Sequence, residues 1–202
     1  MSEPIPISVA VEDELSEAIA LRLLEESPGN FQVGRPYRRS GFGYLKKNMP
    51  GFNKAARGTP FFVLTDLDRR PCPSALIADW LSQPKHPNLI LRVAVREVES
   101  WLLADDDGLS KFLGISKTLV PRAPDTLDDP KKSLILLAAR SKFSNLRAAI
   151  VPPPKSIRVQ GPDYNGPLAK FAQEKWNLRA ARQRSPSLDR ALLAIERFKP
   201  TF

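Results

Sequence analysis

Residues 60–67, Pro-Phe-Phe-Val-Leu-Thr-Asp-Leu, decide the fold class of this chain, because they form a short apolar run that ends in an acid. Such a run is typical of a strand buried on both faces of a parallel sheet. Residues 5–11 and 89–95 are apolar runs of the same kind. Each run is followed by a segment with helical spacing of its apolar residues, at 12–26, 73–81 and 97–112. This alternation predicts an α/β fold with a mainly parallel sheet flanked by helices.

The segments outside this framework give weaker patterns. Residues 31–37 predict a further strand, and residues 40–58 a glycine-punctuated basic loop with one short helix. Beyond Pro121 the strand patterns stop, and three helices joined by proline-rich loops are expected, at 131–142, 167–181 and 187–198. We therefore expect an α/β domain over residues 1–115 and an α-helical extension over residues 116–202, packed on it as one compact unit.

The composition limits the possible chemistry. The 202 residues are 42% hydrophobic, enough for the core of one domain, and hold a single cysteine, Cys72, and a single histidine, His86. These counts exclude an internal disulfide and a cysteine- or histidine-rich zinc site, so catalysis here would depend on carboxylates. No apolar run of membrane-spanning length and no secretory signal is found, which predicts a cytoplasmic protein without a membrane partner.

The basic charge is concentrated in two stretches. The net charge is +9 and the pI about 9.9, and residues 27–65 and 131–162 contain bases but no acid. In the first stretch the bases alternate with aromatic residues and glycines, a combination that suits a nucleic-acid groove. The expected nucleic-acid-binding residues are Arg35, Arg38, Arg39, Lys46, Lys47, Lys54 and Arg57. The alternative is a flexible solubilising loop whose aromatic residues pack on the core.

Acidic residues follow three of the predicted strands: Glu12 the first, Asp66 and Asp68 the one at 60–67, and Glu97 the last. Ligands of open α/β sheets bind at the carboxyl ends of the strands, and residues two apart in an extended chain share a face. Clustered carboxylates repel one another unless a cation neutralises them, and Mg²⁺ or Mn²⁺ prefers such oxygen ligands. We therefore expect Glu12, Asp66 and Asp68 to be catalytic and, with Glu97, to bind the metal. The alternative is that these acids are helix caps and solvated turns.

Residues 97–112 carry a further pattern. Glu97, Trp101 and Asp105 have the spacing of one helical stripe, which places Glu97 nearest the other acids and Trp101 in the core. Glu99 falls on a different face of this helix and is expected to be a salt-bridge partner.

The order of these acids resembles a known catalytic pattern. An acid after the first strand and an Asp-x-Asp after a later one are similar to the Toprim pattern of topoisomerases, primases and OLD-type nucleases. The chain as a whole resembles the Toprim-like DUF4276 family. The matching segments are Val11-Glu12, Leu-Thr-Asp-Leu-Asp at 64–68, Arg-Glu-Val-Glu-Ser-Trp-Leu-Leu-Ala-Asp at 96–105, Asp-Pro-Lys-Lys at 129–132 and Ser-Pro-Ser-Leu at 185–188.

This resemblance implies a Toprim-like fold, Glu12 as general acid/base or metal ligand, and Mg²⁺ held by Asp66 and Asp68. It also implies a partner ATPase and a role in defence against phage or plasmids. One position departs from the pattern, because Toprim proteins place glycine after the first-strand glutamate and Asp13 stands here. Asp13 either crowds the site or replaces a ligand.

Three hypotheses follow. The first is a Mg²⁺-dependent nuclease that acts on DNA or RNA. The second is a non-catalytic module on a Toprim scaffold that binds nucleic acid or a partner ATPase. The third is another Asp-x-Asp enzyme, a haloacid-dehalogenase-type phosphatase or a nucleotide-sugar transferase, although the phosphatase pattern does not place arginines after the motif as Arg69 and Arg70 stand here.

Overall fold

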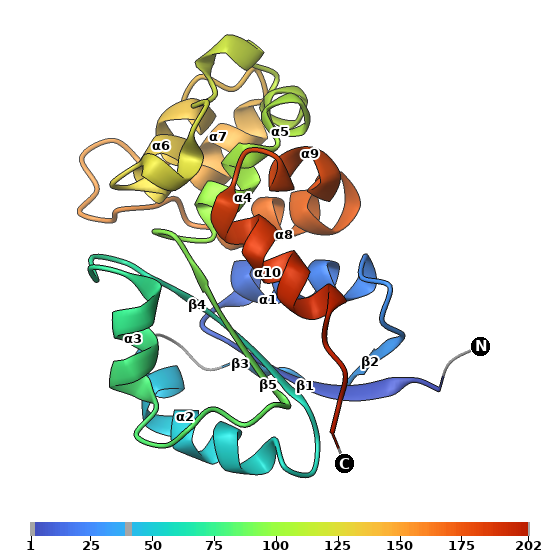
Figure 1. The fold of residues 1–202 in the computed structure, drawn as a ribbon. Helices are drawn as coiled ribbons and strands as arrows, with labels where there is room; N and C mark the ends of the chain where they lie inside the picture. The colour runs from blue at the N-terminus through green and yellow to red at the C-terminus, as the bar shows by residue number, and fades with distance from the viewer. Residues whose placement is uncertain (1–2, 39–41, 202) are drawn as a thin grey trace.

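The sheet has the parallel arrangement that the sequence predicts. In the computed structural model, which describes residues 3–38 and 42–201, every strand pair is parallel (Figure 1). The strand order is β2-β1-β4-β5, and β3 pairs with β1 beyond the end of β2. The strands are β1 (Ile5–Val11), β2 (Phe31–Val33), β3 (Tyr37–Arg38), β4 (Phe61–Asp66) and β5 (Leu89–Ala94). The predicted α/β class is therefore confirmed.

Helices cover both faces of this sheet. They are α1 (Glu14–Glu25), α2 (Phe42–Ala55), α3 (Pro73–Trp80), α4 (Glu99–Ala104), α5 (Asp106–Leu113), α6 (Pro130–Ala138), α7 (Ser144–Ile150), α8 (Asn165–Glu174), α9 (Leu178–Arg182) and α10 (Pro186–Glu196). Two short 3₁₀ turns, Lys117–Leu119 and Pro124–Thr126, lie between α5 and α6. Figure 1 shows α2 and α3 on one side of the sheet, and α1 with the helices after β5 on the other.

Four sequence-based predictions need correction. The loop predicted at 40–58 contains the fourteen-residue helix α2, and the strand predicted at 31–37 is two short strands. The helix predicted at 97–112 is broken at Asp105, which ends α4 and caps α5, so Glu97, Trp101 and Asp105 do not form one helical stripe. The helix predicted at 167–181 is likewise two helices, α8 and α9.

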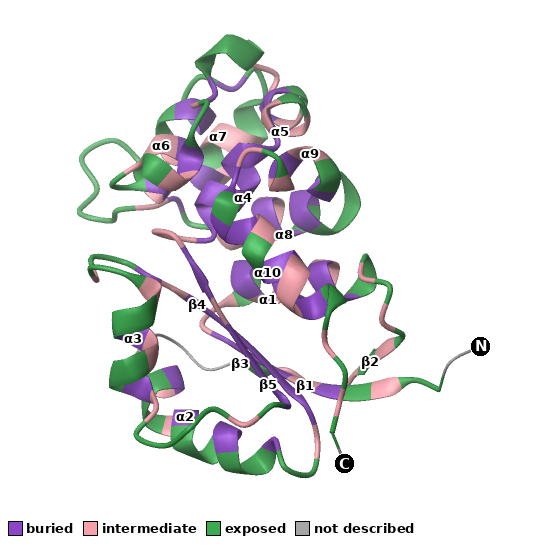
Figure 2. Ribbon diagram, in the orientation of Figure 1, coloured by how far each residue is buried: buried purple, intermediate pink, exposed green. Residues whose placement is uncertain are grey.

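The larger hydrophobic core continues from the sheet into the C-terminal helices. It includes Phe62 and Leu64 of β4, Ile19 and Leu23 of α1, and residues of every helix from α4 to α10 (Figure 2). Trp101 is fully buried there, as expected, and its indole N–H donates to Ser187 Oγ at 2.7 Å. A second core on the opposite face joins α2 and α3 to β4 and β5. The helices after β5 thus share one core with the sheet.

Within the described residues, no helix has both the length and the apolar character needed to span a membrane.

Candidate active site

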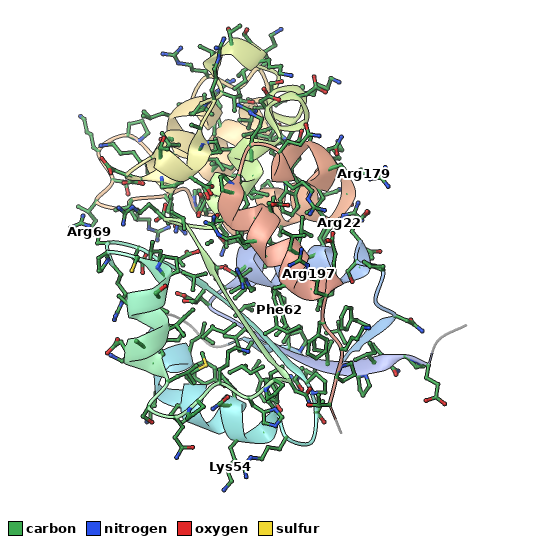
Figure 3. The ribbon with its side chains drawn as sticks, viewed as in Figure 1. Arg22, Lys54, Phe62, Arg69, Arg179 and Arg197 are labelled. Carbon is green, nitrogen blue, oxygen red and sulfur yellow. The ribbon has the colours of Figure 1, made fainter. Side chains whose placement is uncertain are left out.

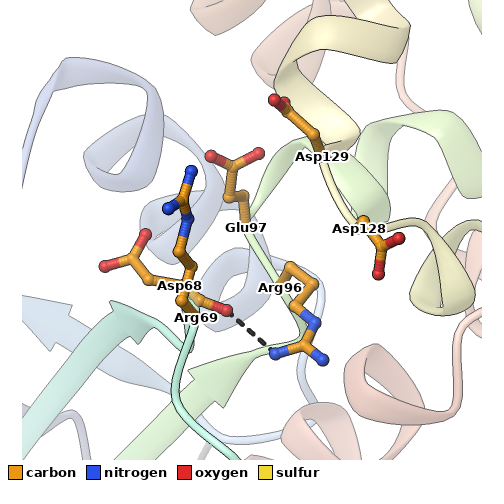
Figure 4. A pocket seen from close by; sticks show the side chains of 6 residues that line it. All are labelled: Asp68, Arg69, Arg96, Glu97, Asp128 and Asp129. Carbon is orange, nitrogen blue, oxygen red and sulfur yellow. Dashed lines mark hydrogen bonds between the residues drawn. The ribbon is translucent and has the colours of Figure 1, made fainter.

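The predicted acids gather at the carboxyl edge of the sheet. Glu12 directly follows β1, Asp66 is the last residue of β4, and Asp68 and Glu97 lie just beyond β4 and β5. Asp66 is paired in register with Ala94, the last residue of β5. A cavity of about 460 Å³ opens at this edge (Figure 4). It is lined by Asp68, Arg69, Arg96, Glu97, Asp128 and Asp129.

Glu12 is oriented by the neighbouring strand β4. The hydroxyl of Thr65, which is 1% exposed, donates to Glu12 Oε1 at 2.5 Å, and the backbone N–H of Asp66 donates to the same oxygen at 3.3 Å. Burial raises the pKa of Glu12, and these two hydrogen bonds oppose the rise by favouring the charged form. Glu12 therefore points toward β4 rather than into solvent, unlike a residue of a solvated turn.

Asp66 lies among other carboxylates. Its Oδ1 accepts a hydrogen bond from the backbone N–H of Val98 at 2.9 Å, which fixes it against the turn after β5. Burial, followed by the charges of Glu99 and Glu12, raises the pKa of Asp66 well above its usual range. Asp66 is thus the electrostatic centre of the acidic group.

Asp68 stands in a backbone conformation that L-residues rarely adopt. Its φ is 51°, and the guanidinium of Arg96 donates to the carbonyls of Asp68 and Arg70 at 3.1 and 3.0 Å. The backbone N–H of Asp68 in turn donates to the carbonyl of Arg96 at 2.9 Å. Arg96 therefore holds the turn that presents Asp68 to the cavity.

Glu97 is bound to a helix of the C-terminal region. Its Oε2 accepts a hydrogen bond from the backbone N–H of Lys131 at 2.8 Å, in the first turn of α6. Burial and the nearby charge of Glu99 raise the pKa of Glu97 to about 7.

Glu99 is buried, 2% exposed, beside the acids that the sequence singled out. Its Oε1 accepts from the hydroxyl of Tyr164 at 2.8 Å and lies 3.5 Å from Lys131 Nζ, the salt bridge expected for this residue. Its other oxygen, Oε2, has no hydrogen-bond partner. Although burial acts to lower it, the pKa of Lys131 is raised, mainly by Glu99 and Glu97. Sequence reasoning did not identify Lys131 and Tyr164, although Lys131 stands in one of the segments that carry the resemblance.

Asp13 acts as a helix cap. Its side chain accepts a hydrogen bond from the backbone N–H of Ser16 at 2.8 Å at the start of α1. The interpretation of strand-end acids as caps is thus correct for Asp13. It also applies in part to Asp66 and Glu97, whose side chains accept from backbone N–H groups at the starts of α4 and α6, whereas Glu12 binds β4. The second oxygen of Asp13 is left for other contacts.

The donor set has the chemistry that Mg²⁺ or Mn²⁺ prefers, because it consists of carboxylates, and Glu99 beside it has a buried oxygen that lacks a partner. The arrangement of these carboxylates, however, is not that of a complete metal site. Within residues 3–38 and 42–201, no three His, Cys, Asp or Glu side chains converge closely enough to hold a metal ion. None of the ion pairs between described residues involves Glu12, Asp66 or Asp68, so no arginine of residues 3–38 and 42–201 blocks these oxygens. The residues fit a divalent cation in kind, and binding would require these side chains to move closer together than they stand here.

The predicted nucleic-acid-binding bases do not all lie at the same edge of the sheet, since Arg38 pairs in register with Val11, next to Glu12, whereas others lie at the opposite end of the strands. Helix α2 leads from the end of β3 back to the start of β4, so Lys54 and Arg57 at its end lie near the amino edge of the sheet, far from Arg69 at the carboxyl edge (Figure 3). Lys46 forms an ion pair with Asp79 at 2.9 Å. The remaining bases are Arg35 in the turn after β2, Arg38 at the end of β3, Lys47 on α2, and Arg39, which lies outside the described residues.

Comparison of the chain with protein-family models, with curated proteins and with solved structures finds no match.

Proposed function

We propose that this protein is a nuclease that hydrolyses phosphodiester bonds of DNA or RNA with the help of Mg²⁺ or Mn²⁺. The observation that carries the proposal is the position of Asp66 at the carboxyl end of β4, where burial and then the charges of Glu99 and Glu12 raise its pKa. Lys131 neutralises part of this negative charge through its ion pair with Glu99. Such an excess of buried negative charge costs folding free energy, and enzymes concentrate it where a cation or a proton transfer uses it. The resemblance to the Toprim-like DUF4276 family supports the same proposal.

Glu12, Asp66 and Asp68 would hold the cation, with Glu97 next to them. A bound divalent ion lowers the pKa of a water molecule and neutralises charge on phosphate oxygens. Glu12, oriented by Thr65 and with a raised pKa, is suited to take or give the proton of the reacting oxygen. Arg69 and Arg96 line the cavity and attract the phosphate of the substrate.

A second candidate function is a non-catalytic module that binds nucleic acid or a partner ATPase. The specific observation in its favour is that no three acidic side chains of the described residues converge on one point. The use of Asp13 as the cap of α1 is consistent with either function, because its second oxygen is not needed for capping. A partner ATPase and a role in defence rest on the family resemblance and are predictions.

The deciding experiment measures cation binding and cleavage separately. Plasmid DNA, single-stranded DNA and RNA are incubated with the full chain and Mg²⁺ or Mn²⁺, and the variants Asp66→Asn and Glu12→Gln are compared with Asp107→Asn. Asp107 is an exposed acid on α5, paired with Lys111, and serves as the matched control. We expect both site variants to lose about 100-fold or more of the cleavage rate, and the control to keep it.

Cation binding is read from the thermal unfolding midpoint, at matched ionic strength. We expect Mg²⁺ to raise the midpoint of the wild type and of Asp107→Asn but not of Asp66→Asn, since a ligand that binds only the native state stabilises it. Metal-dependent cleavage that persists unchanged in both site variants would reject the proposed site. Cation binding without cleavage of any substrate would favour the non-catalytic module, and hydrolysis of p-nitrophenyl phosphate would favour the phosphatase.

A further inference from the structure

A second cavity, of about 280 Å³, lies between β5, the last strand in the sheet order, and the end of α10. Its floor is apolar and includes Ile90 and Phe198, and its rim carries Lys85, Arg92, Arg197 and Lys199. Arg190 of α10 lies close enough to Arg92 to lower its pKa. We call this feature, defined by the five bases, the β5–α10 groove.

The C-terminal tail that forms one wall of the groove is held in place. The side chain of Asn88, which is fully buried, donates to the carbonyl of Thr201 at 2.7 Å and accepts from the N–H of Thr201 at 2.8 Å. This reciprocal pair ties the end of the tail to the turn before β5. Arg197 and Lys199, between α10 and Thr201, are therefore fixed on the same side as Lys85 and Arg92.

The five bases of the groove have no acidic partner. In the part of the chain that the structure describes, none of them forms an ion pair, whereas Arg182 and Arg184 on the same C-terminal segment each do. The Nε–H of Arg92 is buried without a hydrogen-bond partner. Burial lowers the pKa of Lys85 and that of Arg92, and a neighbouring positive charge acts in the same direction on each, Arg92 on Lys85 and Arg190 on Arg92. A cluster of like charges around a buried unpaired donor is destabilising unless an anion binds to it.

We propose that the β5–α10 groove binds the sugar–phosphate backbone of a nucleic-acid strand. The bases would neutralise phosphates, and the apolar floor would contact sugars or bases. Arg92 stands two residues before the end of β5, so about 7 Å of strand separates it from the acidic edge. Arg96, four residues further along the chain, already lines the cavity of the candidate active site. Most of the groove lies at the amino end of β5, and Arg92 is its base nearest the acids along that strand, so a bound nucleic-acid strand would have to run along β5 to reach them. Only the claim that this strand is cut there rests on the proposed function.

Another explanation of the bases is that they protect an exposed sheet edge. β5 is the last strand in the sheet order, and charged side chains on edge strands prevent pairing with other chains. This explanation predicts that removing the bases changes self-association and leaves nucleic-acid binding unaltered, so one experiment distinguishes the two.

The test compares two triple variants of the full chain that remove equal charge. The groove variant removes three exposed bases of the groove and carries Lys85→Gln, Arg197→Gln and Lys199→Gln. The α8–α9 variant removes three exposed bases on and between α8 and α9 and carries Lys170→Gln, Lys175→Gln and Arg179→Gln. Both are made in the Glu12→Gln background and studied in EDTA, so that no strand is cut. Binding of a labelled oligonucleotide of about 20 residues, single-stranded or duplex, is followed by fluorescence anisotropy.

We expect the groove variant to bind the oligonucleotide at least about 10-fold more weakly than the parent. For the single strand, the slope of log affinity against log salt concentration should become shallower by about 2, because three phosphate contacts are lost. We expect the α8–α9 variant to bind within about twofold of the parent. A groove variant that binds like the parent, or no more weakly than the α8–α9 variant, would overturn the proposal.

Further measurements distinguish the source of the anion. Inorganic phosphate at the same phosphate concentration should not displace the oligonucleotide, and sedimentation with anionic phospholipid vesicles should not differ between the two variants. Full displacement by phosphate, or groove-dependent vesicle binding in the absence of oligonucleotide binding, would contradict the proposal. Both proposals are supported if Asp66→Asn loses cleavage but still binds the oligonucleotide through the groove. If the wild type binds through the groove but cleaves no substrate, the groove proposal is supported and the nuclease proposal is rejected.

Discussion

Glu97 and Glu99 are placed so that their charges oppose each other at the edge of the sheet. Glu99 is buried with one oxygen unpartnered, and its charge is a cause of the raised pKa of both Glu97 and Asp66. Lys131 offsets part of this repulsion through its ion pair with Glu99. Each of these acids is therefore less costly to the native state when it is protonated.

Glu97→Gln should stabilise the metal-free protein at pH 8 and leave its stability nearly unchanged at pH 4. The pKa of Glu97 is about 7 in the native state against an ordinary value of 4.5, so the native state binds the proton more tightly and is destabilised as the pH rises from about 4.5 to 7. We expect about 1 to 2 kcal/mol at pH 8, since one pKa unit is worth about 1.4 kcal/mol and partial exposure screens the charge. The measurement is urea unfolding in EDTA at both pH values. Glu174→Gln, an exposed residue at the end of α8, is the control, and an equal shift in both variants would contradict the prediction.

The candidate site could be predicted from the sequence only where its residues follow strands. Glu12, Asp66 and Asp68 stand directly after apolar runs, and the parallel sheet brings the ends of those runs together. Lys131 and Tyr164 come from the helical region, and no periodicity in the sequence indicates which helix of that region reaches the sheet edge. Glu99 was assigned to another helix face because the helix was expected to begin at Glu97, whereas α4 begins at Glu99 itself.

At the scale of the elements, the strands were predicted well because a buried parallel strand needs only a short apolar run. Only a short helix was expected within residues 40–58, because the glycines and Pro50 of α2 are typical of loops. The residues that hold it to the sheet, Leu45, Met49 and Phe52, nevertheless have helical spacing and are buried against β4. Tertiary packing outweighs the low helix propensity here. The break at Asp105 was missed because apolar residues with helical spacing stand on both sides of it, whereas Asp105 ends α4 and caps α5.

Asp105→Ala should destabilise the protein by about 2 to 4 kcal/mol. Asp105 is 1% exposed; one oxygen accepts from the N–H of Gly108 at 2.9 Å as the cap of α5, and the other accepts from the N–H of Asn177 at 2.8 Å before α9. Loss of the cap costs about 1 kcal/mol, and the donor left without a partner costs about 1 to 3 kcal/mol more. Chemical denaturation measures the change. Asp105→Asn, which keeps one acceptor, should lose less, and equal losses in the two variants would contradict this account.

The whole molecule carries its two charge patterns at different edges of the sheet. The acids stand at the carboxyl ends of the strands, and the groove bases lie beside β5, the last strand in the sheet order, mostly toward its amino end. Both features depend on the C-terminal helices, since Lys131 and Tyr164 complete the acidic group and α10 with its tail forms the wall of the groove. The helical region is therefore part of the functional surface as well as of the core.

The sheet region should not fold without these helices, even though residues 1–115 contain every strand of the described chain. A chain cut after residue 115 would lose the apolar residues beyond that point that cover α1 and one face of β4, among them Leu134, Leu168, Phe171, Leu188, Leu192 and Ile195. At about 1.5 to 3 kcal/mol each, their burial is comparable to the 5 to 15 kcal/mol that stabilises a typical domain. We expect the full chain to unfold in one transition, with the same midpoint by near- and far-ultraviolet circular dichroism, and the fragment 1–115 to show no cooperative unfolding. A fragment that unfolds cooperatively near the midpoint of the full chain would mean that the two regions are separate domains, and that the acidic edge can form without Lys131 and Tyr164.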